Sequence, residues 1–127
     1  GSYLAVPNIG VLGSHGANAV PLLATLLAWG QSGLAERIDR AMRLAETLWS
    51  RLDTHPKVEL FGPQSSGVIL WRPHNQSELG SIIERLPVGS TSITSVDGKQ
   101  WLRNVAANPC ADIDELWPKI ERALKKY

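Results

Sequence analysis

The stretch Thr91–Pro109, TSITSVDGKQWLRNVAANP, decides how the rest of the chain is interpreted. Two runs that favour extended structure, residues 91–96 and 100–107, flank Asp97-Gly98-Lys99. An Asp-Gly step between two such runs is a strong short-range signal for a β-hairpin, because the turn needs residues that tolerate positive φ. The stretch therefore predicts two antiparallel strands late in the chain.

Upstream of this hairpin, the sequence predicts another pair of strands and a helix. KVELFG (57–62) and GVILWRP (67–73) are separated by a polar turn, and the continuous apolar run of the second predicts burial on both faces. Asn75 and Glu78 resemble a capping pair at the start of a helix that would bury an apolar stripe. That stripe is Leu79, Ile82, Ile83 and Leu86.

Helices are also expected at both ends of the chain. Residues 17–29 are apolar on nearly every side and are expected to be covered all round, whereas residues 34–52 have one apolar face and one charged face. The Gly30–Gly33 break separates the two. Asp112 is expected to cap a final helix, in which Pro118 either causes a kink or delays the start.

The order of these elements is helix, helix, strand, strand, helix, strand, strand, helix. Antiparallel strand pairs interleaved with helices are typical of layered folds, in which each helix buries its apolar side against a sheet. The sequence therefore predicts an α+β fold, with two long leading helices followed by a small antiparallel sheet that helices cover on one face.

Composition excludes several classes of protein. A chain of 127 residues with a net charge of +1 can bury a core of its own, and it lacks the excess of Lys and Arg that nucleic-acid binding requires. Cys110 is the only cysteine, which excludes an intramolecular disulfide and a Cys-based zinc site and favours a cytoplasmic location. No metal site is expected, because His15, His55 and His74 lie far apart. The apolar stretch 19–29 is about half the roughly 20 residues of a membrane span, so no membrane partner is expected.

Two places could carry chemistry. The Gly13–Gly16 turn precedes a helix, so its backbone N–H groups and the Ser14 hydroxyl could hold a phosphate; a tight turn with Ser14 as helix cap is the alternative. Arg103 shares a strand face with Trp101 and Val105, and its planar guanidinium matches a carboxylate. That carboxylate could belong to a ligand or to a structural Asp or Glu, and a solvated strand arginine is the remaining alternative.

At these two places the sequence resembles the C-terminal part of the group II pyridoxal-phosphate (PLP)-dependent amino-acid decarboxylases. This family includes the glutamate and aromatic-amino-acid decarboxylases and has the aspartate-aminotransferase fold. The more specific likeness is Asp97–Pro109, which looks like the family's "DG…(W)LR-x-V-x-x-NP" strand. Tyr3-Leu4, the Gly13-Ser14 turn, the apolar helix and the Gly30–Gly33 break extend the resemblance to nearly the whole chain.

The resemblance implies roles for individual residues. Arg103 corresponds to the arginine that binds the substrate α-carboxylate, and Ser14 with Gly13 to the turn that contacts the cofactor phosphate of the neighbouring subunit. His15 stands where the family commonly has arginine, and an imidazole is a weaker, pH-dependent partner for an anion. His15 and Tyr3 are candidates for the edge of the site; for Tyr3 an ordinary strand aromatic is the alternative.

The resemblance further implies a dimeric parent enzyme that binds PLP and converts an L-amino acid to its amine and carbon dioxide. In the family, the lysine that forms the Schiff base follows a histidine in the large domain, and no lysine of this chain does. These lysines are Lys57, Lys99, Lys119, Lys125 and Lys126. The chain is therefore expected to have no catalytic residue of its own, no covalently bound cofactor and no activity without the large PLP-binding domain as its partner.

The resemblance also suggests how the chain is divided. We expect residues 1–2 to be a tag remnant, 3–16 an extended segment and glycine-flanked turn from the end of the large domain, 17–54 two linking helices, and 55–127 the α+β small domain. A free-standing, non-catalytic α+β binding or dimerisation module is the alternative function. A decarboxylase-derived regulatory subunit is a third, supported only by His15. Which amino acid the parent enzyme would use stays open.

Overall fold

The computed structural model describes residues 19–108 and 110–125. The chain divides into two compact units, Gly1–Ala35 and Glu36–Tyr127. The packing described below is that of the second unit, which contains the sheet. Among the described residues, no helix is both long enough and apolar enough to cross a membrane.

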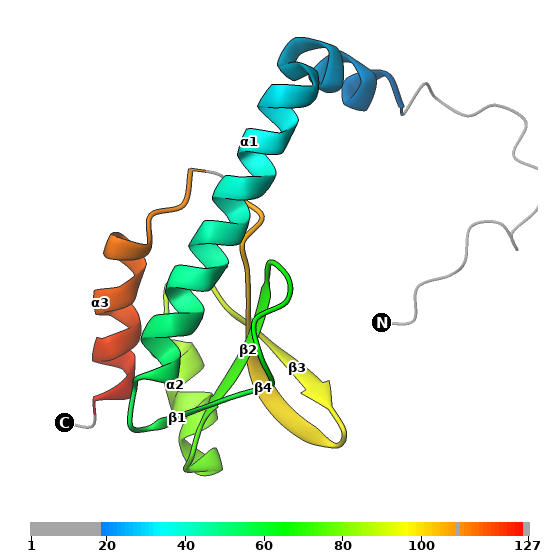
Figure 1. Ribbon diagram of the computed structural model, residues 1–127. Helices are drawn as coiled ribbons and strands as arrows, with labels where there is room; N and C mark the ends of the chain where they lie inside the picture. Colours follow the sequence, from blue (N-terminus) through cyan, green and yellow to red (C-terminus); the bar gives the residue numbers. More distant parts are fainter. Residues whose placement is uncertain (1–18, 109, 126–127) are drawn as a thin grey trace, which may run out of the picture. The chain divides into compact units, whose positions relative to one another are not determined.

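Four strands form one antiparallel sheet in the order β1-β2-β4-β3 (Figure 1). The strands are β1 (Val58–Leu60), β2 (Val68–Pro73), β3 (Ser92–Val96) and β4 (Lys99–Val105). The turn between β3 and β4 has positive φ at both central residues, 50° at Asp97 and 72° at Gly98, as a type I′ turn requires. The predicted hairpin is confirmed.

The prediction that residues 67–73 are buried on both faces is wrong for the start of β2. Val68 is 44% exposed and Leu70 is half-buried. Ile69 and Trp71, which alternate with them along the strand, are buried. The reason is that consecutive side chains of a strand point to opposite faces, and only one face of this sheet is covered by helices.

The helices are α1 (Ala19–Asp53), the short 3-10 helix η2 (Gln76–Glu78), α2 (Leu79–Arg85) and α3 (Ile113–Leu124). Gly30 interrupts α1 with non-helical dihedral angles, φ 64° and ψ −176°, at the break that the sequence predicts. The predicted capping pair is also present, because the Asn75 side chain accepts from the Ser77 backbone N–H and donates to Glu78.

The core lies between the sheet and these helices. It joins buried side chains from the C-terminal part of α1, from α2 and α3, and from one face of β1, β2 and β4. The largest fully buried side chains include Leu52, Trp71, Ile82, Leu102 and Ile120. Figure 1 shows α2, α3 and the C-terminal part of α1 grouped along the sheet. The predicted α+β fold is therefore confirmed.

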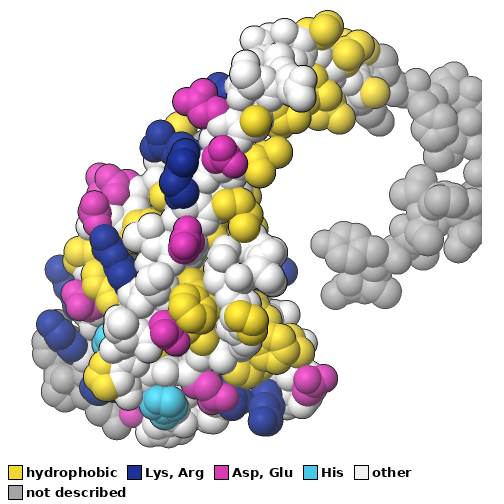
Figure 2. All heavy atoms as spheres, viewed as in Figure 1, with side chains coloured by type: hydrophobic (Ala, Val, Ile, Leu, Met, Phe, Trp, Pro, Cys, Tyr) yellow, Lys and Arg dark blue, Asp and Glu magenta, His cyan; other side chains and the backbone are white. Residues whose placement is uncertain are grey.

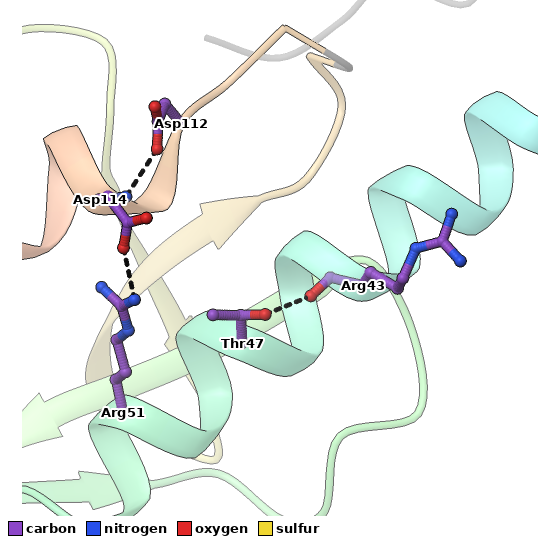
Figure 3. A network of polar contacts seen from close by, with 5 residues as sticks. All are labelled: Arg43, Thr47, Arg51, Asp112 and Asp114. Atoms are coloured by element: carbon purple, nitrogen blue, oxygen red, sulfur yellow. Dashed lines mark hydrogen bonds and ion pairs between the residues drawn. The ribbon is translucent and has the colours of Figure 1, made fainter.

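The start of α3 is fixed by two aspartates (Figure 3). The Asp112 side chain accepts from the backbone N–H of Asp114 over 2.8 Å, which caps the helix as predicted. Asp114 forms an ion pair with Arg51 of α1, so this pair links two helices on the same side of the sheet. Pro118 lies inside α3 and does not delay its start, which is Ile113.

The N-terminal part of α1 exposes apolar side chains. Val20, Leu22, Leu23 and Leu27 are each more than half exposed, and Figure 2 shows apolar side chains gathered on this part of the helix. Within the described residues this helix is therefore not covered all round, and the predicted covering would have to come from another surface.

Candidate functional site: the open face of the sheet

The face of the sheet opposite the helices is where Arg103 lies. The strand register places Arg103 between Leu70 of β2 and Ser92 of β3, and Trp101 opposite Thr94. We call this surface the open face. Its residues are Glu59, Phe61, Val68, Leu70, Arg72, Ser92, Thr94, Trp101, Arg103 and Val105.

The Arg103 side chain is exposed and forms one hydrogen bond among the described residues. Its Nε donates to Oγ of Ser92 over 3.1 Å. No carboxylate of the described residues forms an ion pair with Arg103. The structural Asp or Glu that was one possible partner for its guanidinium is therefore not present in this part of the chain. The terminal amino groups of the guanidinium are accessible to an external anion.

Arg72, one row away on the same face, has the opposite environment. Its Nη2 lies 2.7 Å and its Nε 2.8 Å from Oε2 of Glu59, and its guanidinium carbon lies 4.3 Å from the ring centroid of Trp101. The side-chain amide of Gln76, with its oxygen toward Arg72, accepts from Nε and Nη1 at 3.1 Å. The charge of Arg72 is therefore compensated within the domain.

Sequence patterns do not single out this second arginine. The sequence does place Arg72 at the end of one predicted strand and Glu59 in the strand before it. Whether the two side chains meet depends on the register of β1 and β2, which sequence patterns do not give. Phe61 completes the cluster with an edge contact to Trp101 at 5.2 Å between ring centroids. Packing of this kind buries Trp101, whose indole N–H has no hydrogen-bond acceptor in the part of the chain described.

Asn104 holds β4 from the core side. Its Oδ1 accepts from Nε1 of Trp71 over 2.8 Å, and its Nδ2 donates to the Ser90 carbonyl at 2.7 Å and to Oγ1 of Thr91 at 2.9 Å. Asn104 is buried, so these bonds fix both the strand and the turn before β3. Because neighbouring side chains alternate between faces, the anchored Asn104 places Arg103 on the open face.

The other residues predicted for the site lie outside the described residues. They are Ser14, Gly13, His15 and Tyr3. The structure therefore does not test whether the glycine-flanked turn approaches Arg103, and these assignments stay predictions.

None of the described lysines follows a histidine in the sequence, and Nζ of Lys57 donates to the backbone carbonyl of Leu124 over 3.2 Å. The described residues also contain no group of three or more His, Cys, Asp or Glu that could hold a metal ion. Arg103 is thus the candidate that the described residues offer for contact with a small anion.

The site is a surface and not a pocket. A cavity of about 330 Å³ lies among α1, the end of β4 and the start of α3, and its lining includes Asn104 and Val105 but not Arg103. A carboxylate held on the open face would therefore be exposed to water on one side. A second surface would exclude this water and strengthen the contact.

Comparison with known proteins adds information on the fold. No family model matches the chain, and no curated protein matches it in sequence. Solved structures do match. The chain is similar to tryptophan decarboxylase from Catharanthus roseus in complex with L-tryptophan, with a TM-score of 0.69 and 16% sequence identity over 80% of this chain and 25% of that one.

Two further solved structures are similar over a comparable part of the chain. The glutamate decarboxylase domain of diaminobutyrate-pyruvate transaminase and L-2,4-diaminobutyrate decarboxylase from Vibrio parahaemolyticus matches with a TM-score of 0.64 and 22% identity, over 84% of this chain and 25% of that one. Oryza sativa TDC with PLP and tryptamine matches with a TM-score of 0.69 and 16% identity, over 80% and 25%.

The chain spans about a quarter of the length of the solved structures it matches. At these identities the likeness concerns the fold. It agrees with the expectation from the Asp97–Pro109 hairpin. The chain therefore has the fold of the C-terminal domain of the group II PLP-dependent decarboxylases.

Proposed function

We propose that this chain is the C-terminal domain of a PLP-dependent L-amino-acid decarboxylase, in which Arg103 binds the α-carboxylate of the substrate. The reaction of the complete enzyme would release the carboxylate carbon as carbon dioxide and put a proton in its place. This domain would supply binding groups and not the Schiff-base lysine.

The observation that carries the proposal is the contrast between the two arginines of the open face. Arg72 is neutralised by Glu59 and stacked on Trp101, whereas Arg103 has a serine hydroxyl as its hydrogen-bond partner among the described residues. A guanidinium that no acidic group of its own domain neutralises is suited to bind an external carboxylate in a two-pronged geometry.

The surroundings of Arg103 support a small organic acid as the ligand. Leu70 lies beside it in the neighbouring strand, and Val68 and Val105 form an exposed apolar pair one row further along. Contact with apolar side chains on one side, and with a covering domain on the other, would exclude water and strengthen the attraction between guanidinium and carboxylate. The large PLP-binding domain of the same enzyme is the partner we propose for this face.

Ser14 and Gly13 complete the proposal through the resemblance alone. We propose that they contact the cofactor phosphate of the neighbouring subunit in a homodimer, with His15 and Tyr3 at the edge of that site. His15 would make the phosphate contact dependent on pH, because only the protonated imidazole adds a positive charge.

The first experiment is to determine the natural reading frame upstream of Tyr3. The proposal expects a large α/β domain that contains a His-Lys pair within the preceding few hundred codons. An initiation codon immediately before Tyr3 would show that the chain is a free-standing small domain, and the decarboxylase proposal would then be wrong.

The second experiment replaces Arg103 by Ala in the complete enzyme. Loss of a charged, two-pronged contact is expected to lower kcat/KM roughly 10- to 100-fold. Arg103→Lys should recover part of the loss, because it keeps the charge but not the planar fork. Arg122→Ala, a change of an exposed arginine on α3, is the matched control, and equal kinetics for the Arg103 and Arg122 variants would contradict the assignment.

The exposed apolar surface of α1 favours one other candidate, a free-standing dimerisation module. Val20, Leu22 and Leu27 need a covering surface whichever function is correct. Sedimentation of the isolated chain separates the two. A dimerisation module should form one defined oligomer over a wide concentration range, whereas a domain that lacks its partner should associate without a fixed size.

A further inference from the structure

We propose that Ser92 is a positioning residue that directs Arg103 to bind a carboxylate end-on, through Nη1 and Nη2. The inference rests on the proposed carboxylate-binding role of Arg103 and deepens it, because it states which edge of the guanidinium is used and which residue selects that edge.

The geometry starts from the strand register. Ser92 of β3 lies directly opposite Arg103 of β4, and Leu70 of β2 lies opposite Arg103 on its other side. Leu70 offers no polar atom, whereas Ser92 Oγ accepts from Nε of Arg103 over 3.1 Å. The hydroxyl is therefore the polar group in the neighbouring strands that sets the tilt of the guanidinium.

A guanidinium can meet a carboxylate along two kinds of edge. One edge uses Nε with one terminal nitrogen, and the other uses the two terminal nitrogens, Nη1 and Nη2. Because Ser92 occupies Nε of Arg103, the edge between Nη1 and Nη2 stays available. In the described part of the chain, no acceptor is hydrogen-bonded to either of these two nitrogens.

The side edge of Arg72, on the same face, is occupied by a carboxylate. There Nε and Nη2 both point at Glu59, so its side edge holds a carboxylate of the domain itself. No serine lies at the equivalent place, because Glu59 is the register partner of Arg72. Both cross-strand partners therefore accept from Nε, but the partner of Arg72 is a carboxylate that neutralises it, whereas the partner of Arg103 is a neutral hydroxyl.

Holding the side chain in one orientation also affects affinity. A free arginine side chain has many rotamers, and immobilising it on ligand binding has a cost that the hydrogen bond to Ser92 removes in advance. Loss of the hydroxyl is expected to weaken carboxylate binding roughly threefold to tenfold. It should also free Nε to take part in binding.

The experiment uses the 127-residue chain in solution and sodium benzoate as the probe, since benzoate has one planar carboxylate and an apolar ring that suits Leu70 and the valines beside it. The ¹H–¹⁵N signals of the Arg103 side chain are followed during titration. In the wild-type chain, benzoate should shift the Nη signals and leave Nε–H nearly unchanged. In Ser92→Ala, binding should weaken by the stated factor and the Nε–H signal should move.

Two variants control for changes in the fold. Ser92→Thr restores a hydroxyl on the same strand position and should restore both the affinity and the unshifted Nε–H signal. Ser95→Ala removes a hydroxyl from the other face of β3 and should behave as the wild type. Equal binding and equal spectra for Ser92→Ala and the wild type would overturn the role of Ser92, as would failure of Ser92→Thr to restore them.

A third variant separates this inference from the proposed function. Arg103→Ala should abolish saturable benzoate binding. If Arg103→Ala binds benzoate as the wild type does, or if the wild type does not bind it, the carboxylate-binding role of Arg103 is contradicted and the role of Ser92 with it. If Arg103→Ala abolishes binding while Ser92→Ala does not change it, only the role of Ser92 is wrong.

Discussion

Arg103 and Asn104 are adjacent in β4 and have opposite environments. Asn104 is buried and forms three hydrogen bonds that tie Trp71 to the turn before β3, whereas Arg103 is exposed and is bonded only to a serine hydroxyl among the described residues. The strand thus combines a residue that stabilises the fold with one that is available for binding. The two roles lead to different expectations for substitution.

Asn104→Leu should lower the free energy of unfolding by about 2–4 kcal/mol, because the Trp71 indole N–H and the Ser90 carbonyl would lose their buried partner. Urea denaturation followed by tryptophan fluorescence measures this loss. Gln100→Leu, an exposed position in the same strand, is the control and should change stability by no more than about 0.5 kcal/mol. Similar losses for the two variants would contradict the structural role of Asn104.

The two arginines of the open face should respond differently to replacement by alanine. Arg72→Ala removes the stack on Trp101 and leaves Glu59 without its partner, so a loss of about 2 kcal/mol in the free energy of unfolding is expected. Arg103→Ala should cost no more than about 0.5 kcal/mol, since its one bond is exposed. Denaturation of both variants side by side tests this, and a larger loss for Arg103→Ala would refute it.

The cap and the ion pair at the start of α3 should also differ. Asp112→Ala removes the side-chain acceptor for the Asp114 N–H and is expected to cost about 1 kcal/mol. Asp114→Ala removes the exposed pair with Arg51 and should cost at most a few tenths of a kcal/mol. Thermal denaturation in low and high salt checks the distinction, because only the effect of Asp114→Ala should shrink as salt is added.

His55 should make stability depend on pH. Burial lowers the pKa of His55 below its ordinary value of 6.5; the Glu121 carboxylate opposes this shift and the Lys57 charge adds to it. With the folded-state pKa below the unfolded one, the unfolded chain binds more protons as pH falls below about 6.5, so stability is complete above that pH and declines below it. The backbone N–H of Lys57 also donates a hydrogen bond to Nδ1 of His55 over 3.3 Å, and protonation of Nδ1 would break this bond.

The measurement for His55 is the melting temperature as a function of pH between 5 and about 8. His55→Phe keeps a ring beside Trp117, with which His55 makes an edge contact, and should flatten the decline at acidic pH. His74→Gln, at an exposed position, is the control. An acidic decline of the same size in His55→Phe and the wild type would mean that other groups cause it.

Sequence patterns predicted most of the fold. Periodicity placed the helices, and the Asp-Gly step placed the hairpin that carries Arg103, because both signals are local in the chain. The burial of β2 was predicted wrongly, because a continuous apolar run does not show that one face of the sheet is left uncovered. Which strands are neighbours, and hence which side chains meet Arg103, depends on contacts between distant segments.

The candidate site could be predicted only in part for the same reason. Arg103 was selected from its residue type and strand position, but its contact with Ser92 and the compensation of Arg72 by Glu59 follow from strand register. Residue type and strand position describe Arg72 equally well, so local patterns do not explain why the two arginines differ. The distinction arises from their cross-strand partners.

The strand order has a consequence for how the domain folds. The β1–β2 and β3–β4 pairs each join segments close in the chain, whereas β2 and β4 pair Val68 with Val105 across η2, α2 and the whole of β3. Closing that long loop costs conformational entropy before the stabilising contacts of the core have formed. We expect the β2–β4 pairing to be the rate-limiting step, with early native contacts at Trp71 and Leu102, so that substitutions there slow folding while those in β1 mainly speed unfolding.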